Sequence, residues 1–273
     1  GNGRGYTGMS IRGSDGSRIN VTINGVPLND SESHATYWVD LPDFASSISS
    51  IQIQRGVGTS TNGAGAFGGS INVSTKKQSQ APKFKLSNSF GSYGTLKNSI
   101  SFTTGRVGKY FELNGNLSKI YSDGYIDRAS SNLKGYFLQG SYDKDRTSIK
   151  FIAFGGHERT YQAWYGLDQE TLSTNRKFNY AGMYFNDDGD QFFYDKQEDN
   201  YKQDHYQLIF NHKINPSWRA NLTFHYTHGR GYYEEYNEDQ NLSDYLIFDN
   251  SGELISDLIL SLIHISEPTR LAW

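Results

Sequence analysis

Two stretches of the chain combine aromatic rings with carboxylates, the residue types that bind flat or saccharide-like ligands. One lies within residues 155–200 and contains Trp164-Tyr165 and Phe192-Phe193-Tyr194, and the other is Tyr232-Tyr233-Glu234-Glu235-Tyr236. Rings stack on such ligands, and carboxylates orient them. The alternative is that these rings pack against one another within the loops. The candidate ligand-binding residues here are Trp164, Tyr165, Tyr233, Glu234 and Tyr236.

The histidines and the acidic runs give no convincing metal-site pattern. His225 and His228 are three positions apart on an expected strand and therefore point to opposite faces, as do His205 and His212. The run Asn186-Asp187-Asp188-Gly189-Asp190 lacks the spacing of a calcium-binding EF-hand loop. We predict no metal-ligating residues and no cofactor, with calcium in this acidic run as the open alternative.

Catalytic patterns are also absent from the sequence. The chain has no Cys, which excludes thiol catalysis, Cys-ligated zinc, iron–sulfur clusters and disulfide scaffolds. It contains no nucleophile elbow, no H-E-x-x-H and no spaced carboxylate pair of the kind a glycosidase needs. The sequence therefore predicts a protein that is not an enzyme and has no catalytic residues.

One glycine-rich run matches a nucleotide-binding fingerprint by letter only. Gly63-Ala64-Gly65-Ala66-Phe67-Gly68 fits G-x-G-x-x-G, which needs a following helix to hold a pyrophosphate. Residues 70–75 instead predict a strand, and the position of the ribose-binding acid is occupied by Asn88-Ser89. We interpret these glycines as tight turns between short strands.

Composition favours a β architecture. The 273 residues carry 26 Lys and Arg against 29 Asp and Glu, so the basic excess of a nucleic-acid-binding protein is missing. The chain holds 20 Tyr, 16 Phe, 4 Trp and 29 Gly, yet it is only 36% hydrophobic. No apolar window reaches the roughly 18 residues of a transmembrane helix. Many amphipathic rings and tight turns without long apolar runs predict strands with alternating faces.

From residue 83 onward the pattern becomes a series of amphipathic strands. Phe111, Leu113 and Leu117 alternate with Glu112 and Asn114, which places apolar side chains on one face and polar side chains on the other. Strands of 9–12 residues can cross a bilayer when tilted. We predict seven strands, at 83–91, 95–105, 109–121, 133–142, 147–156, 201–213 and 218–230.

Apart from a tight first turn at 92–94, the connections between these strands alternate in length. The links at 106–108, 143–146 and 214–217 are short, whereas those at 122–132 and 157–200 are long. Short turns at one end and long loops at the other are typical of an outer-membrane barrel, and a soluble sandwich does not need them. The sequence therefore predicts an incomplete antiparallel transmembrane β-barrel, with part of its aromatic content forming a girdle at the outer interface.

The first 80 residues contain four sequence blocks in a characteristic order. These are Ile11-Arg12-Gly13, the run 18–28 ending Asn24-Gly25-Val26-Pro27-Leu28, Ile51-Gln52-Ile53-Gln54-Arg55-Gly56, and the run 63–76. They resemble the plug domain of TonB-dependent outer-membrane receptors, and residues 37–75 look most like receptors of Bacteroidota. Asn24 and Asn62 stand where many members have Asp and Tyr.

The resemblance implies a mostly β fold in three parts. Residues 1–80 would be a plug domain, 81–259 the N-terminal part of a 22-stranded barrel, and 260–273 a non-native tail. The tail, within which residues 261–270 look like translated sequencing-adapter read-through, would carry no biological meaning. Residues 1–10 show no secretion signal, so we expect either a cytoplasmic protein or, as the resemblance implies, an internal piece of a longer receptor without its signal and TonB box.

The resemblance also implies function and location. A receptor of this family sits in the bacterial cell outer membrane and imports a scarce solute, such as a siderophore, haem, cobalamin or an oligosaccharide. Its partners would be the TonB–ExbB–ExbD energy-transducing complex, outer-membrane lipid and a small-molecule or oligosaccharide ligand, but not nucleic acid. The alternatives are a passive porin or a surface adhesin with a barrel wall and, less favoured, a soluble β enzyme.

Two further groups of site residues follow from the resemblance. Plug loops that face outward grip ligand in this family, and by position these loops are residues 1–9 and 29–38 here. Plug arginines pair with glutamates of the barrel wall, which assigns Arg12 and Arg55 as a plug latch with partners on strands outside this chain. The candidate ligand residues of the plug are Asp30, Glu32, His34, Tyr37 and Trp38.

Overall fold

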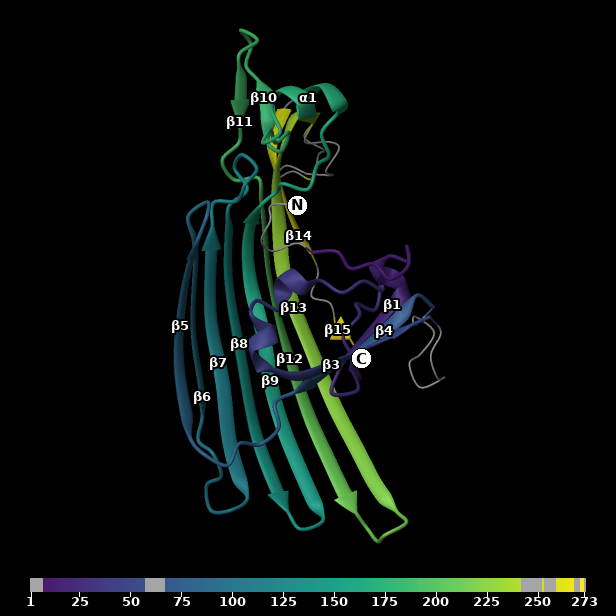
Figure 1. Ribbon diagram of the computed structural model, residues 1–273. Coiled ribbons are helices and arrows are strands. Elements are labelled where there is room, and N and C mark those ends of the chain that lie inside the picture. Colours follow the sequence, from purple (N-terminus) through teal and green to yellow (C-terminus); the bar gives the residue numbers. More distant parts are fainter. Residues whose placement is uncertain (1–6, 57–66, 242–251, 253–258, 268–270, 273) are drawn as a thin grey trace.

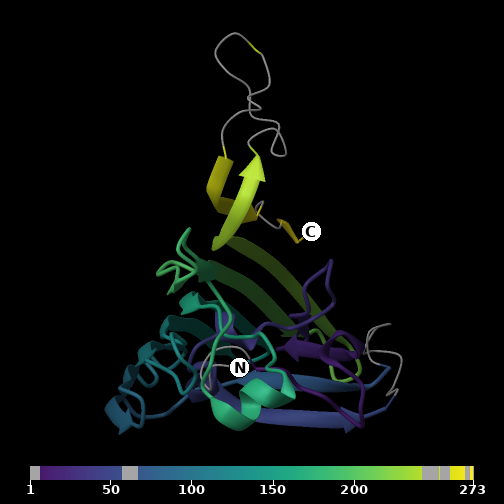
Figure 2. The same cartoon turned by 90° about the horizontal axis from the view of Figure 1, so that it is seen from above.

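The structure is a computed structural model that describes residues 7–56, 67–241, 252, 259–267 and 271–272. It consists of a small N-terminal unit and a long curved sheet, with the small unit lying against the inner face of the sheet (Figures 1 and 2). Nearly all regular structure is β, as predicted. Within the described residues no helix is long and apolar enough to span a membrane.

The N-terminal unit is built on a four-stranded sheet in the order β2-β1-β4-β3. Asn24 and Gly25 both have positive φ, 55° and 84°, and form the predicted turn between β1 and β2. Pro27 pairs with Thr22, and beyond it the Leu28 N–H still donates to the Val21 carbonyl at 2.9 Å. The elements are η1 (Gly16–Arg18), β1 (Ile19–Ile23), β2 (Val26–Pro27), η2 (Trp38–Asp40), η3 (Phe44–Ser47), β3 (Ile48–Arg55) and β4 (Gly69–Thr75).

The strand predicted after the glycine-rich run is confirmed as β4. It pairs in parallel with β1 and antiparallel with β3, so no helix N-terminus follows the glycines. This removes the dinucleotide interpretation, because a pyrophosphate has no helix end to bind. Residues 57–66, which contain most of the fingerprint, lie outside the described residues.

The long sheet contains the seven predicted strands, each antiparallel to its neighbour in sequence order. We call these seven strands the wall. They are β5 (Lys83–Gly91), β6 (Thr95–Thr103), β7 (Phe111–Ser122), β8 (Ser131–Lys144), β9 (Thr147–Tyr161), β12 (Glu198–Lys213) and β13 (Arg219–Asn241).

Three wall strands extend at one end by three residues or more beyond the predicted bounds. β9 continues past 156 to Tyr161, β12 begins at Glu198 instead of 201, and β13 continues past 230 to Asn241. All three extensions lie at the end of the wall that carries the long connections (Figure 1). The β9–β12 and β12–β13 ladders continue without a break to Glu198, through glycine, acidic and amide residues that carry little strand propensity of their own, so cross-strand pairing overrides that propensity. Beyond Glu234, β13 pairs with β14 across a register shift.

The long connection between β9 and β12 is partly ordered, whereas the sequence predicted a loop. It contains α1 (Gln169–Thr174) and a hairpin of β10 (Met183–Phe185) and β11 (Gln191–Phe193). Asp168 caps α1, since its carboxylate accepts a bond from the Thr171 backbone N–H at 2.9 Å. The predicted alternation holds from β7 onward, where the connections at 145–146 and 214–218 are short and those at 123–130 and 162–197 are long. The connection at 104–110, predicted to be short, is longer than the one at 92–94 at the opposite end of the wall.

The two faces of the wall have the predicted polarity. On β7, Phe111 and Leu117 are exposed on the outer face, whereas Glu112 and Asn114 are buried on the inner face. β13 shows the same outward placement of Leu222 and Phe224. The inner face of β13 near residues 219–225 is also exposed, because the N-terminal unit does not cover it.

Two hydrophobic clusters join the two units, and the smaller one consists of Val39, Ile120 and Leu133. Leu41 and Phe44 of the N-terminal unit pack with Phe137, Ile152 and Phe154 of the wall. The Phe44 ring lies 5.0 Å from that of Phe154 and 6.0 Å from that of Phe137, between ring centroids. The inner face of the wall therefore owes its buried apolar residues to the unit that it encloses.

A pair of glycines lets the N-terminal unit approach the wall backbone. Gly135 of β8 and Gly156 of β9 are register partners. A Cβ on Gly135 would lie 2.3 Å from the Pro42 carbonyl oxygen, and one on Gly156 would lie 2.3 Å from the Asp40 carbonyl oxygen. We call this the glycine notch; the segment from Asp40 to Pro42 lies in it.

Two further strands, β14 (Ile259–Glu267) and β15 (Leu271–Ala272), pair with β13. Except for Ile259, they fall within residues 260–273, which the sequence predicts to be a non-native tail. Pairing of a β-prone segment with an exposed sheet edge needs only free backbone groups, so it does not distinguish a native strand from an accidental one. The tail stays a prediction.

Candidate functional site

A cavity of about 350 Å³ lies between the N-terminal unit and the wall, at the end that carries the long connections. This volume is in the range of small-molecule sites. Three parts of the chain form it: the segment after β2, the first residues of the long connection, and the extended ends of β9, β12 and β13. Its lining consists of Asp30, Tyr37, Asp40, Glu158, Gln162, Trp164, Tyr165, Asp199, Tyr201, Gln203, Tyr232, Tyr233 and Glu235.

The loop that brings Asp30 to the cavity is held by side-chain bonds to backbone. The Asn29 amide donates to the carbonyls of Ile19 and His34, both at 2.8 Å, and its oxygen accepts from the Val21 N–H at 2.7 Å. The Asp30 carboxylate accepts from the Ser33 N–H at 2.7 Å. These bonds close the loop onto β1, so Asp30 is positioned before any ligand arrives.

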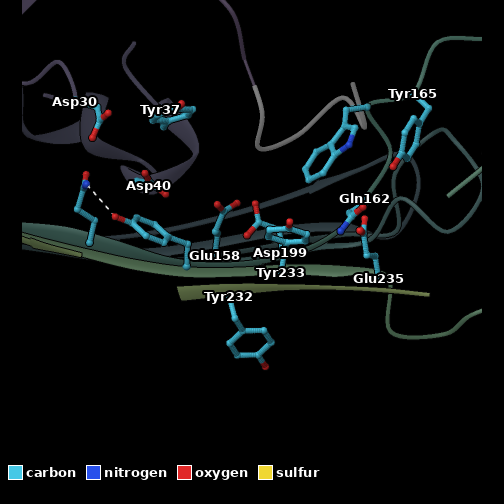
Figure 3. A pocket seen from close by; sticks show the side chains of 13 residues that line it. Asp30, Tyr37, Asp40, Glu158, Gln162, Tyr165, Asp199, Tyr232, Tyr233 and Glu235 are labelled. Atoms are coloured by element: carbon cyan, nitrogen blue, oxygen red, sulfur yellow. Dashed lines mark hydrogen bonds between the residues drawn. The ribbon is translucent and has the colours of Figure 1, made fainter. Parts of the chain in front are cut away.

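The wall contributes a patch set by strand register. Glu158 of β9 lies opposite Tyr201 of β12, and Asp199 of β12 lies opposite Tyr233 of β13. All four side chains are on the inner face, since they continue the alternation that buries Ile152 and Gln207. Figure 3 shows Glu158, Asp199 and Tyr233 rising from the sheet toward Asp40 and Tyr37, whereas the Tyr232 ring points away from them.

Two glycines make room for the ring of Tyr201. A Cβ on Gly229 would lie 2.0 Å from the Tyr201 hydroxyl oxygen, and one on Gly231 would lie 2.4 Å from its Cδ2. The ring therefore lies across β13 where side chains are missing. Its hydroxyl accepts a bond from the Gln203 amide at 3.4 Å, the dashed line in Figure 3.

The upper part of the cavity is tied to the wall by amides. The Gln162 amide donates to the Glu234 carbonyl at 3.3 Å, and the Asn179 amide donates to the Gln162 carbonyl at 2.9 Å. Trp164 and Tyr165 follow directly and are 45% and 48% exposed. The chain thus anchors its backbone here and leaves two rings accessible beside the cavity.

Five of the ten predicted ligand residues lie together in this cavity: Asp30, Tyr37, Trp164, Tyr165 and Tyr233. Glu32 and His34 are exposed on the same N-terminal loop but outside the lining, and Trp38 packs against the shared core. Their predicted contact with ligand has no support from this geometry.

Glu234 and Tyr236 instead hold the long connection against β13. The Tyr194 hydroxyl donates to the Glu234 carboxylate, and the Tyr236 ring packs on Tyr184 with centroids 4.5 Å apart. The Tyr236 N–H also donates to the Gln197 side-chain oxygen at 2.8 Å. Glu234 and Tyr236 therefore fit the alternative stated above, in which these residues pack within the loops and do not bind ligand.

The sequence reasoning missed eight lining residues: Asp40, Glu158, Gln162, Asp199, Tyr201, Gln203, Tyr232 and Glu235. The sequence pattern could have identified most of the wall residues among these eight. Continuing the two-residue alternation of β9, β12 and β13 past their predicted ends places Glu158, Asp199 and Glu235 on the inner face. Asp40 had no such signal, because it is placed by the docking of η2.

Two residues of the long connection, Asp168 and Tyr194, have shifted pKa values caused largely by burial and by hydrogen bonds within the folded connection. The Tyr180 hydroxyl, which donates to Asp168 at 2.6 Å, is the main cause of a lowered pKa at Asp168, with further bonds from Thr171. Burial, and then the bond to Glu234, raise the pKa of Tyr194. The shifts favour an ionised Asp168 and a protonated Tyr194 at neutral pH. In these states Asp168 accepts, and Tyr194 donates, the hydrogen bonds that hold the connection.

The predicted latch arginines form no salt bridge with the described part of the wall. Arg12 and Arg55 are both exposed, and neither forms an ion pair with a described residue. A different ion pair joins the two units: Lys97 of β6 pairs with Asp43, whose side chain is 2% exposed. Asn116 also donates to Asp43 at 3.4 Å. Asp43 adopts the left-handed conformation, φ 57°, which directs the start of η3.

No group of three or more His, Asp or Glu residues in the described part of the chain is arranged to hold a metal ion. His205 and His212 do point to opposite faces: His205 is buried and stacks on Phe154, and His212 bonds to Thr147. In the acidic run, the Asn186 side-chain oxygen accepts from the N–H groups of Asp188 and Asp190, which makes a turn. Calcium binding there stays a prediction.

Residues 1–70 match the family profile of the TonB-dependent Receptor Plug Domain. No curated protein matches the sequence. Among solved structures, the chain is similar to the ferric-catecholate import receptor Fiu of Escherichia coli K12, with 15% identity and a TM-score of 0.62 over 96% of this chain and 35% of Fiu. It is also similar to the ferric citrate transporter FecA, with 14% identity and a TM-score of 0.64 over 85% of this chain and 34% of FecA. The copper transporter OprC gives 14% identity and a TM-score of 0.60 over 85% of this chain and 35% of OprC.

These similarities establish the fold. The chain spans about a third of the length of each of these receptors.

Proposed function

We propose that the chain comprises the plug domain and the first barrel strands of a TonB-dependent receptor of the bacterial outer membrane, and that this receptor serves energised import of a scarce solute. The solute binds in the cavity described above, and TonB with ExbB and ExbD drives displacement of the plug. The long connections then face the cell exterior and the short turns face the periplasm. The Bacteroidota placement stays a prediction from sequence.

One observation carries this proposal: the cavity is lined by both the plug and the wall. A ligand that touches Asp40 of the plug and Glu158 of the wall has its affinity tied to the position of the plug. By linkage, displacement of the plug must weaken binding of that ligand. A site made by the wall alone would lack this coupling.

The contacts between plug and wall also suit a plug that moves. Gln139 of the wall accepts from the Thr75 hydroxyl at 2.8 Å and donates to the Lys76 carbonyl at 3.0 Å. Gln207 donates to the Ile23 carbonyl at 3.2 Å. Water can replace such bonds, so each costs only about 0.5–1.5 kcal/mol to break. The apolar part of the interface consists of the cluster around Phe44 and a smaller cluster of Val39, Ile120 and Leu133.

The exposed plug arginines fit this proposal as a second contact with the remainder of the barrel. Arg55 ends β3, an edge strand whose side chains are largely exposed in the described structure. Charge reversal, Arg55→Glu, in the complete receptor should reduce uptake more than surface binding of the solute. Equal loss of uptake and binding would refute a latch role.

A passive porin or an adhesin is the alternative. Neither accounts for a plug whose core residues pack with the inner face of the wall. A depletion assay separates these functions: cells with and without TonB express the complete receptor and receive a mixture of ferric citrate, haem, cyanocobalamin, maltohexaose and N-methylquinolinium. Mass spectrometry should show depletion of one class only when TonB is present. Depletion that persists without TonB would contradict active import.

A further inference from the structure

A second cavity, of about 600 Å³, lies at the end of the wall opposite to the long connections (Figure 1). Three connections that follow one another along the wall form it: those between β6 and β7, between β8 and β9, and between β12 and β13. The plug contributes no residue to its lining. We call it the turn cavity, and it is separate from the cavity between the two units.

Basic side chains dominate the lining of the turn cavity. Of the residues described around it, only Asp143 and Asp145 are acidic. The whole chain, by contrast, carries 26 Lys and Arg against 29 Asp and Glu. The lining is therefore cationic, although the chain as a whole is slightly anionic. Its basic residues, two at each of the three connections, are Arg106, Lys109, Lys144, Arg146, Lys213 and Arg219.

These six cations do not hold the wall together by ion pairs. All six residues are exposed, and none forms an ion pair with a residue in the described part of the chain. Two of them are positioned by other contacts. The Arg146 guanidinium donates to the Ile214 carbonyl at 3.4 Å, and the Lys144 ammonium lies 5.4 Å from the centre of the Tyr110 ring. The six charges are thus available to a ligand.

Strand register adds neutral hydrogen-bonding groups to the same cavity. Lys213 lies opposite Arg219, and Asn211 lies opposite Asn221. These four residues continue the two-residue alternation that buries Gln207 on the inner face of the wall. The start of β9 adds a serine hydroxyl to the lining. The inner face at this end therefore combines guanidinium and ammonium groups with amide and hydroxyl donors.

This set of donors suits a phosphate group better than other ligands. Arginine forks and lysine ammonium groups bind phosphate oxygens through short charge-assisted hydrogen bonds. A phosphate monoester carries about two negative charges at neutral pH and presents its oxygens in several directions, so it can contact cations from three connections. A single carboxylate is planar and carries one charge. A neutral or cationic ligand would gain nothing from six basic groups.

We propose that the turn cavity binds phosphate groups, with Arg106, Arg146 and Arg219 as the main ligands from its three connections. Two sources present this chemistry at the periplasmic side, where the proposed function places the short turns: a soluble phosphorylated compound and the headgroup of an anionic phospholipid. Either source offers the same oxygens to the same cations. The bound phosphate then joins three connections of the wall, at the end opposite to the cavity between plug and wall.

Calorimetric titration of the complete receptor in detergent tests this site with four probes. Pyrophosphate represents the soluble source, and citrate is its control, a polyanion without phosphate. Short-chain phosphatidylglycerol represents the lipid source, and short-chain phosphatidylcholine is its control, a lipid without net charge. We expect pyrophosphate or phosphatidylglycerol to bind at least about tenfold more tightly than its control, the size of one charge-assisted hydrogen bond. Added NaCl should weaken that binding, because the cations are exposed.

Matched variants locate the bound phosphate. Arg106→Gln and, separately, Arg219→Gln should each weaken the bound probe about tenfold, since each removes charge-assisted hydrogen bonds from a different connection. Arg176→Gln is the control, because Arg176 is an exposed arginine of the long connection at the opposite end of the wall. It should change the affinity less than about twofold. Both cavity arginines are exposed and form no ion pair with a described residue, so their variants should fold.

Binding of pyrophosphate would assign the turn cavity to a soluble compound, and binding of phosphatidylglycerol without pyrophosphate would assign it to lipid. Both results support the inference. It is overturned if neither probe binds, if the control of the bound probe binds equally well, if either cavity variant keeps full affinity, or if Arg176→Gln loses as much affinity as they do.

The proposed function fails separately. Depletion of a solute that persists without TonB would refute the importer and leave phosphate binding at the turn cavity intact. TonB-dependent depletion by a receptor that binds neither phosphate probe would refute the turn cavity as a phosphate site and leave the importer intact.

Discussion

The glycine notch yields the prediction that the structure defines most sharply. Alanine at Gly135 would put its Cβ 2.3 Å from the Pro42 carbonyl oxygen and 2.9 Å from the Ser118 hydroxyl. Alanine at Gly156 would put its Cβ 2.3 Å from the Asp40 carbonyl oxygen and 2.5 Å from Pro42 Cδ. Ordinary contact begins at 3.4 Å, so the plug segment must retreat by about 1 Å in either variant.

That displacement has a defined cost. It moves Phe44 away from Phe137 and Phe154, which are packed at 6.0 and 5.0 Å between ring centroids. Overpacking of this kind costs about 1–3 kcal/mol. Because both alanines push the same plug segment, the double variant should cost less than the sum of the two single variants.

Hydrogen exchange, measured by mass spectrometry on the folded complete receptor, detects the loss of plug stability in individual peptides. Peptides from β1 and β4 of the plug should exchange roughly tenfold faster in Gly135→Ala and Gly156→Ala, whereas wall peptides from β7 should be unchanged. Gly140→Ala is the control, since it lies on β8 and nothing would lie within 4 Å of its Cβ. Equal exchange in Gly135→Ala and Gly140→Ala would refute the idea that the plug is seated in the notch.

Two further predictions concern contacts made elsewhere by the plug and the long connection. Lys97→Met should destabilise plug docking by about 1–3 kcal/mol and Asp43→Asn by less, because only the first leaves the deeply buried Asp43 charge without its cation; plug exchange rates in the two variants check this order. The pKa of Asp168 is lowered in the folded connection, so its contribution to stability is present above the ordinary Asp pKa of 3.8 and is lost as the pH falls through the lowered value. Exchange protection of the Thr171 amide, measured from pH 7 downward, should therefore persist to about pH 4 and decrease below it, and a decrease already at pH 6 would contradict the assignment.

The sequence predicted those parts of the fold that depend on local pattern. The alternation around Phe111 and Glu112 and the turn at Asn24-Gly25 each lie within one strand or one hairpin, so their residues report their own structure. The same reasoning stopped too early on β9, β12 and β13. The ends of these strands are held by neighbours far away in the sequence, and local propensity does not register such pairing.

The cavity between the two units could be predicted only in part for the same reason. Asp30, Tyr37, Trp164, Tyr165 and Tyr233 stood out by residue type. Asp40 and the Lys97–Asp43 pair depend on how the plug docks into the wall, a contact between residues 54 positions apart for that pair. Glu234 and Tyr236 have the right chemistry but serve to hold the long connection, which residue type alone cannot reveal.

Locking the plug to the wall tests the central claim, that import requires plug movement, most directly. The described chain has no native Cys, so Asp43→Cys with Lys97→Cys places one thiol on each side of the plug–wall contact for a reducible bifunctional thiol reagent. In cells with TonB, uptake of the solute identified by the depletion assay should stop on cross-linking and recover on reduction, while binding at the surface is retained. Uptake that continues with the plug cross-linked would contradict the account.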